Sequence, residues 1–259
     1  MGFLAGRTPL AIPAASAMLL VCGCSTLPLT GPDTVPPLRT YEAVVTGEGP
    51  RVLEVSDPIE GFNRSTYRFN YYFDTYLFRP VVRAYDFVVP DYAKDRVSSA
   101  IDNIDEFGNL TNNLFQLKLK SAGITLSRFV INSTVGVAGL WDPATSWGLK
   151  RQTEDFGLTL GHYGAGNGPY IFLPVLGPSN VRDTIGLSAD WTAFSLVGPI
   201  AWIHEPGFPI VYSGIYAVDK RHRIPFRYRQ TGSPFEYELL RMLYIIKREI
   251  DLANSETSN

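Results

Sequence analysis

Cysteine and histidine are scarce in this sequence, and their scarcity limits the chemistry open to the protein. The 259 residues include two cysteines and three histidines. A disulfide between Cys22 and Cys24, two positions apart, would close a strained ring and stabilise none of the fold. A structural zinc site needs about four ligands, and no histidine lies near the two cysteines in the sequence. We therefore expect no metal site, no cofactor, and a fold that depends on packing alone.

An excess of positive charge is also missing. The formal net charge is −2 and the isoelectric point is about 5.9. Nucleic-acid-binding domains carry basic patches, so we expect no nucleic-acid partner. The motifs of common enzymes are absent as well, because the chain has no GxSxG, SxxK or HExxH pattern and no P-loop. The sequence therefore predicts a protein that is not an enzyme.

The N-terminus has the composition of a bacterial export signal. Residues 1–23 contain one basic residue, Arg7, no acidic residue, and an apolar stretch over residues 9–23, which is typical of a secretory signal peptide. Val21-Cys22-Gly23-Cys24 resembles the bacterial lipoprotein box, which predicts cleavage before Cys24 and acylation of that cysteine. The alternatives are a plain signal peptide or a buried N-terminal helix. Acylation would anchor the chain stably, and by lipoprotein sorting rules Ser25 implies the outer membrane, on its periplasmic face.

The segments that follow differ in composition. Residues 24–56 hold five prolines and no hydrophobic periodicity, which is typical of a linker. We expect a lipidated flexible tether over residues 24–56, a single helical domain over residues 57–252, and a disordered tail over residues 253–259.

Hydrophobic spacing in this domain is mainly helical. Asp57, Pro58 and Glu60 form a helix-start pattern, and further helices are expected over residues 91–107, 109–119 and 233–251. The first and last helices each carry an apolar stripe at helical spacing. The stripes consist of Phe62, Phe69, Phe73 and Tyr76, and of Leu239, Leu243, Ile246 and Ile250.

Two apolar segments raise the question of a membrane. Residues 122–141 are long enough to span a bilayer, but Arg128, Asn132 and three glycines favour a buried or half-buried helix. Residues 157–214 alternate short apolar runs with glycine and proline, and tryptophans and tyrosines border these runs, as occurs where apolar surface meets lipid head groups. A large soluble core and a body lying in the membrane interface both remain open from this pattern.

Several long motifs resemble the MlaA/VacJ family of outer-membrane lipoproteins. They are DPIEGFNRSTYRFN, RPVVRAYDFVVP, RFVINSTVGVAGLWDPA, EDFGLTLGHYGAGNGPYIFLPVLGPSNVRD and YELLRMLYIIKREI, and they cover residues 57 to about 190, with a weaker likeness to about residue 250. The resemblance implies a ring-like helical domain with amphipathic membrane-embedded helices and Gly/Pro-rich loops, lying in the inner leaflet of the outer membrane. It also implies a channel that removes misplaced phospholipids from the outer leaflet and passes them to a soluble periplasmic carrier, beside trimeric porins.

Polar residues within these motifs are the expected wall for the lipid head group. The candidates are Asn63, Arg64, Asn70, Arg128, Asn132, Arg182 and Asp183. The alternative is that they form an internal hydrogen-bond and ion-pair network that closes the ring. The segment Ser99-Ala100-Ile101 departs from the Asn-Phe-Phe-like stretch of the family. Two other functions remain open: a structural porin-associated lipoprotein without transport activity, and an envelope lipid hydrolase, for which no nucleophile set is visible.

Overall fold

The computed structural model describes residues 55–203, 205, 207–230 and 232–257. Every described residue belongs to the second of the chain's two units, Arg39–Asn259. The predicted signal peptide, the lipidation site Cys24 and nearly all of the predicted tether lie outside the described residues.

Helices account for most of the second unit, so the predicted mainly α fold is confirmed. In order, the elements are α1 (Glu60–Phe73), the π-helical turn η2 (Asp74–Phe78), α2 (Arg79–Val88), α3 (Asp91–Phe115), α4 (Leu119–Thr134), α5 (Pro143–Ser146), α6 (Phe156–His162), β1 (Tyr170–Leu173), β2 (Gly177–Asn180), α7 (Val181–Val197), the 3₁₀ turn η3 (Pro199–Trp202), α8 (Phe208–Arg223) and α9 (Glu236–Thr257). None of the described helices is both long enough and apolar enough to span a bilayer.

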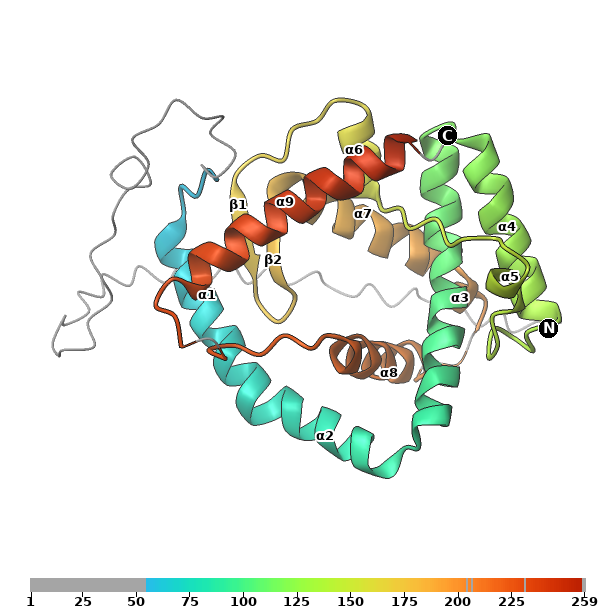
Figure 1. The fold of residues 1–259 in the computed structure, drawn as a ribbon, viewed down its shortest axis with the longest axis horizontal. Coiled ribbons are helices and arrows are strands. Elements are labelled where there is room, and N and C mark those ends of the chain that lie inside the picture. The colour runs from blue at the N-terminus through green and yellow to red at the C-terminus, as the bar shows by residue number, and fades with distance from the viewer. Residues whose placement is uncertain (1–54, 204, 206, 231, 258–259) are drawn as a thin grey trace, which may run out of the picture. The chain divides into compact units, whose positions relative to one another are not determined.

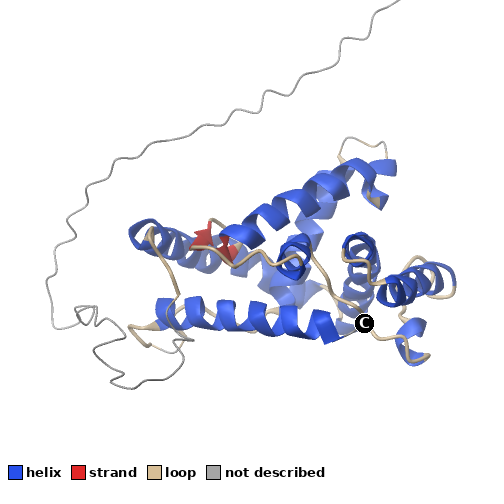
Figure 2. Cartoon of the chain, turned by 90° about the horizontal axis from the view of Figure 1, so that it is seen from above, coloured by secondary structure: helices blue, strands red, loops and turns tan. Residues whose placement is uncertain are grey.

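The helices of this unit form a frame. In Figure 1, α1 and α2 form one side, α3 a second and α9 a third, while the β-hairpin, α7 and α8 lie within the frame. Helix α4 packs along the outer side of α3, and α5 follows it. Figure 2, seen from above, shows helices throughout, with β1 and β2 as the one small sheet of the described part of the chain.

The hairpin and two helices share a small aromatic core. Strands β1 and β2 pair antiparallel, with Tyr170 opposite Asn180. Tyr170 and Phe172 from β1 are fully buried and pack with Tyr67 of α1 and Tyr237 of α9. The ring of Tyr67 lies edge-on to Phe172 at 5.7 Å and to Tyr237 at 6.0 Å. This core joins the start of the chain's helical part to its end.

Two predicted helix boundaries were wrong. Residues 91–107 and 109–119 were expected as separate helices, but α3 runs unbroken through Gly108 to Phe115. A glycine in a helix interior costs only about 1 kcal/mol, which the packing of α3 against α4 outweighs. Asp57 does not cap α1, whose N-cap is Ile59. The Asp57 carboxylate instead accepts hydrogen bonds from Asn63 at 2.7 Å and from Tyr237.

The expected tail over residues 253–259 is also helical as far as it is described, because α9 continues to Thr257. The reason is a buried polar contact near its end. The Ser255 hydroxyl donates to Glu154 at 2.6 Å and accepts from the fully buried Lys118. These bonds hold the last turns of α9 against the segments before α4 and α6.

Candidate membrane-facing surface and the polar network beneath it

The apolar stripe of the first helix faces outward rather than into a core. Phe62, Phe69 and Tyr76 lie seven residues apart and are 56%, 49% and 70% exposed. The opposite face of the helix is buried, and it carries Asn63 and Asn70. The sequence predicted the stripe, of which Phe73 is half-buried, but the orientation of its exposed members is the reverse of that in a soluble helix.

The same inversion recurs along the chain. In α9, Leu239, Leu243 and Ile250 are exposed, while Arg248 is buried. Further exposed apolar side chains come from α2 and α4; they are Val81, Phe87, Val88, Leu119, Leu126 and Val130. Among the described residues, buried polar and charged side chains outnumber buried hydrophobic ones. A soluble domain has the opposite arrangement, and large exposed apolar areas mark membrane or protein contact sites.

Helix α3 carries a continuous polar face toward the inside of the frame. Its members are Ser98, Asp102, Asp105, Asn109, Asn112 and Gln116, spaced four, three, four, three and four residues apart. That spacing places them on one side of the helix. They contact α8, the loop before α6 and α7: for example, Ser98 donates to Asp219 at 2.5 Å and Asn112 to Asp190 at 2.9 Å.

Of the seven predicted lipid-path residues, Asn63, Arg64 and Asn70 join α1 to the hairpin and α9. Asn63 donates to the carbonyl of Tyr170 at 3.1 Å and accepts from the Phe172 amide at 2.8 Å. Asn70 makes the same kind of paired contact with the hairpin turn, donating to a carbonyl at 2.9 Å and accepting from an amide at 2.7 Å. Arg64 pairs with Glu60 at 2.6 Å and with Glu238 of α9.

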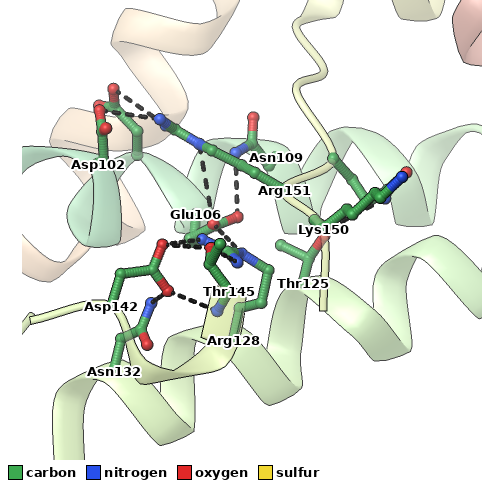
Figure 3. A network of polar contacts seen from close by, with 12 residues as sticks. Asp102, Glu106, Asn109, Thr125, Arg128, Asn132, Asp142, Thr145, Lys150 and Arg151 are labelled. Atoms are coloured by element: carbon green, nitrogen blue, oxygen red, sulfur yellow. Dashed lines mark hydrogen bonds and ion pairs between the residues drawn. The ribbon is translucent and has the colours of Figure 1, made fainter. Parts of the chain in front are cut away.

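Arg128 and Asn132 lie in a second network, between α3, α4 and α5 (Figure 3). The guanidinium of Arg128 pairs with Glu106 at 2.7 Å and with Asp142 at 3.0 Å. It also donates to the Thr145 hydroxyl at 3.0 Å. Asn132 donates to Asp142 at 3.0 Å. Glu106 is 1% exposed and Arg128 is 2% exposed, so this pair is held inside the protein.

The groups of this network stabilise one another in their charged forms. Burial alone would raise the pKa of the Asp142 carboxyl, but hydrogen bonds from Thr145, Arg128 and Asn132 outweigh it and lower the pKa to about 2. Burial would also lower the pKa of Arg128, yet Glu106 and Asp142 raise it above its usual value. Both groups are therefore charged at neutral pH, as an internal ion pair requires.

Arg182 and Asp183 lie in a third network, which ties α7 to α6 and α9. Asp183 accepts from Arg248 at 2.8 Å, from Tyr244 at 2.8 Å and from Asn180 at 2.7 Å. Arg248 also pairs with Asp155, the N-cap of α6, at 2.8 Å. Burial opposes the charge on Asp183, but the bonds from Arg248 hold the pKa of its carboxyl below the usual value. Arg182 lies beside Asp183 at 3.0 Å.

The structure therefore divides the seven predicted residues among three separate networks, in which each has a partner within the protein. Ser99-Ala100-Ile101 lies in the middle of α3, where Ile101 is buried and Ser99 donates to the Asp95 carbonyl. Across the segments the structure covers, no cluster of three or more histidine, cysteine or acidic residues is suited to a metal ion.

One group of charged residues was missed by the sequence reasoning. Asp102 and Asp105 of α3 pair with Arg151 before α6 and with Lys220 and Arg223 at the end of α8. The regular spacing of polar residues along α3 could have indicated this. It places carboxylates and amides in one stripe opposite an apolar side, and such a stripe needs water or polar side chains from other segments as partners.

Together, the fold and the surface define an α-helical protein with apolar outer faces and a polar interior. Residues 55–251 match the model of the family described as MlaA lipoprotein. The chain belongs to the MlaA lipoprotein family, which confirms the resemblance seen in its motifs.

The chain is also similar to curated proteins, two of which are named MlaA. An uncharacterized protein of Rickettsia prowazekii is 42% identical over 131 residues, covering 51% of this chain and 52% of that protein. The intermembrane phospholipid transport system lipoprotein MlaA of Escherichia coli is 39% identical over 139 residues, 52% of this chain and 55% of the relative. The protein of the same name from Haemophilus influenzae is 32% identical, covering 66% and 68%. The chain thus spans about half the length of the first two relatives.

A solved structure has the same fold. It was reported as the structural basis for maintenance of bacterial outer membrane lipid asymmetry, and it superposes with a TM-score of 0.64 at 29% identity. The superposition covers 76% of this chain and 99% of the other.

Proposed function

We propose that this protein removes misplaced phospholipids from the outer leaflet of the outer membrane and passes them to a soluble periplasmic carrier, thereby maintaining the lipid asymmetry of that membrane. The observation that carries the proposal is the inverted arrangement of the second unit, with apolar helix faces outside and polar networks inside. The names of the curated relatives and the subject of the solved structure support the same role.

The apolar faces suit a body lying in one leaflet of a bilayer. Taking a large apolar side chain out of water stabilises the buried state by about 1.5–3 kcal/mol. The exposed stripes of α1 and α9 together hold several such side chains, including Phe62, Phe69, Leu239 and Leu243. Helices that lie in the interface plane bury an apolar face in this way without crossing the membrane. Acylation at Cys24 would add the anchor and fix the protein to the periplasmic face.

Transport then needs no covalent step. A phospholipid has a charged end and an apolar end, so its route requires polar and apolar walls together. The partly exposed part of the α3 polar face, at Asp102 and Asp105, and the exposed apolar surfaces of the neighbouring helices would supply both kinds of wall. Net movement follows from the different stability of the lipid in the membrane and on the carrier.

The seven candidate residues have a supporting role in this account. Their protein partners hold the frame closed: Asn63 and Asn70 fix the hairpin to α1, Arg128 fixes α4 to α3, and Asp183 fixes α7 to α9. Trimeric porins, which the family resemblance implies as neighbours, would contact the outer apolar faces.

The test is the amount of phospholipid in the outer leaflet of a deletion strain. We expect it to rise on deletion, to return to normal with the wild-type gene, and to stay high with Cys24→Ala, because the unanchored protein does not reach the membrane. No rise on deletion would contradict the proposal and favour a structural role beside porins. Full restoration by Cys24→Ala would contradict only the prediction that an acylated Cys24 anchors the protein.

A further inference from the structure

Five charged side chains gather where α3 meets the end of α8. We call Asp102, Asp105, Arg151, Lys220 and Arg223 the α3–α8 cluster. Their side chains are between 23% and 35% exposed, unlike the closed pair of Arg128 and Glu106. The cluster is therefore open to a ligand while still being partly shielded from water.

The cluster contains linked ion pairs. Asp102 accepts from Arg223 at 2.8 Å and from Arg151 at 2.8 Å, the latter contact being visible in Figure 3. Asp105 accepts from Lys220 at 2.9 Å and lies 3.6 Å from Arg151. Lys220 also lies 4.0 Å from Asp102. Asp102 thus has three cations nearby and Asp105 has two, and Arg151 and Lys220 each bridge the two carboxylates.

The charges of this region cancel. Asp219, which is buried, pairs with Arg223 at 2.5 Å. With it, three carboxylates face three cations. Glu106 lies 3.8 Å from Arg151, but its charge is balanced by Arg128 at 2.7 Å, so the region has no net charge to attract a simple anion. A zwitterion is different, because its phosphate can replace a carboxylate on a cation while its ammonium replaces that cation on the carboxylate. Such an exchange leaves no charge unpaired, which matters at a partly shielded site.

An aromatic row continues from the cluster along α8. It consists of Phe208, Tyr212 and Tyr216, which follow one another at intervals of four residues. The ring centroids of Phe208 and Tyr212 are 6.5 Å apart, and those of Tyr212 and Tyr216 are 5.9 Å apart. The row ends at Lys220, whose ammonium lies 5.1 Å from the ring of Tyr216. From residue 208 to residue 220 the helix rises about 18 Å, close to the roughly 15 Å that one leaflet contributes to the hydrocarbon core.

We propose that the α3–α8 cluster binds the head group of a zwitterionic phospholipid, with the phosphate on Arg151, Lys220 or Arg223 and the ammonium on Asp102 or Asp105. One acyl chain lies along the aromatic row. The protein consequently prefers phosphatidylethanolamine over the anionic phosphatidylglycerol. This inference rests on the proposed function and adds the class of head group that the transport route selects.

The preference can be measured as a lipid ratio. The full chain is reconstituted in vesicles of equal amounts of phosphatidylethanolamine and phosphatidylglycerol, extracted in mild detergent, and its bound phospholipids are quantified by mass spectrometry. Exposed ion pairs contribute up to about 1 kcal/mol, so we expect phosphatidylethanolamine to be enriched about two- to fivefold over the vesicle ratio.

Single substitutions in the cluster should change the ratio of bound phosphatidylethanolamine to bound phosphatidylglycerol in opposite directions. Asp105→Asn leaves the cluster with a net positive charge, so the ratio should fall toward or below one. Lys220→Gln leaves it negative, so phosphatidylglycerol should be excluded further. The control is Asp251→Asn, which breaks an ion pair on α9 with Lys247 at 2.5 Å, a lysine that is 67% exposed, and it should leave the ratio unchanged. Tyr212→Ala should reduce total bound lipid without changing the ratio.

The outcomes separate the two proposals. Bound phospholipid at the vesicle ratio, equal in wild type and both cluster variants, would overturn this inference and leave the proposed function standing. Absence of bound phospholipid from the wild type would overturn both. Should Asp105→Asn fail to fold, as judged by circular dichroism, the Lys220→Gln ratio decides the matter.

Discussion

Replacing Arg128 is the strongest test of whether the buried polar residues hold the fold or contact lipid. Arg128→Met keeps the length of the side chain but removes its charge. It leaves the Glu106 carboxylate, 1% exposed, with the Asn109 amide as a hydrogen-bond donor at 3.1 Å and with Arg151 Nε, at 3.8 Å, as the nearest cation. Removing one partner of a buried ion pair costs about 3–5 kcal/mol, because the remaining charge stays buried without compensation.

That cost should appear as a loss of thermal stability. For a unit of about 200 residues, each kcal/mol shifts Tm by about 2–4 °C, so we expect Tm to fall by about 6–20 °C. The assay is far-UV circular dichroism on the protein in detergent micelles. Arg83→Met, at an exposed arginine on α2, is the control and should change Tm little.

A double variant adds a second check. Arg128→Met combined with Glu106→Leu removes both charges of the pair, and replacing a buried pair by apolar residues is often neutral. We expect it to recover much of the lost Tm. An unchanged Tm in Arg128→Met together with defective lipid transport would refute the reasoning, and it would place Arg128 on the lipid path instead.

Three further predictions concern local structure. Gly139→Ala should lower stability by more than 1 kcal/mol in a chemical unfolding titration, because Gly139 has φ +86° and a new Cβ would lie 2.6 Å from a neighbouring side-chain carbon; Gly123→Ala in α4, with open space around it, should be neutral or stabilising. When the pH is lowered from 4 to 2, the free energy of unfolding should fall by about 1 kcal/mol more in wild type than in Asp142→Asn. The folded-state pKa of the Asp142 carboxyl is lowered to about 2, so its charged form stabilises the fold above the unfolded-state pKa. That contribution is lost as the carboxylate protonates. Truncation after Leu252 should lower Tm, because it removes Ser255 from a buried lysine–glutamate pair; an unchanged Tm would mean that the last turns of α9 add no stability.

Helix positions could be predicted from the sequence because apolar spacing follows the helical period. The stripes of α1 and α9 were found in this way. Their orientation could not be predicted, since periodicity defines a face and does not say whether protein or lipid covers it. Phe69 and Leu243 are outside, whereas Asn63 and Arg248 are inside.

The hairpin and the α3–α8 cluster could not be predicted from the sequence, for different reasons. Strands β1 and β2 have four residues each, too short for an alternating pattern, and they depend on Asn63 and Asn70 from a distant helix for their hydrogen bonds. In the cluster, Asp102 is separated from Arg223 by 121 positions, so no local pattern joins them. The candidates were chosen as polar residues within motifs, and the structure shows that such residues bind other parts of the same chain.

The most direct test of the central claim, that the apolar helix faces contact lipid, is the environment of labelled positions in reconstituted vesicles. A bimane label is placed at Phe69→Cys, Leu126→Cys or Leu243→Cys, with Lys150→Cys as an exposed charged control. We predict that brominated phospholipids quench the three apolar positions while aqueous iodide quenches the control. Equal quenching of all four positions by iodide, with no effect of the brominated lipid, would contradict the account.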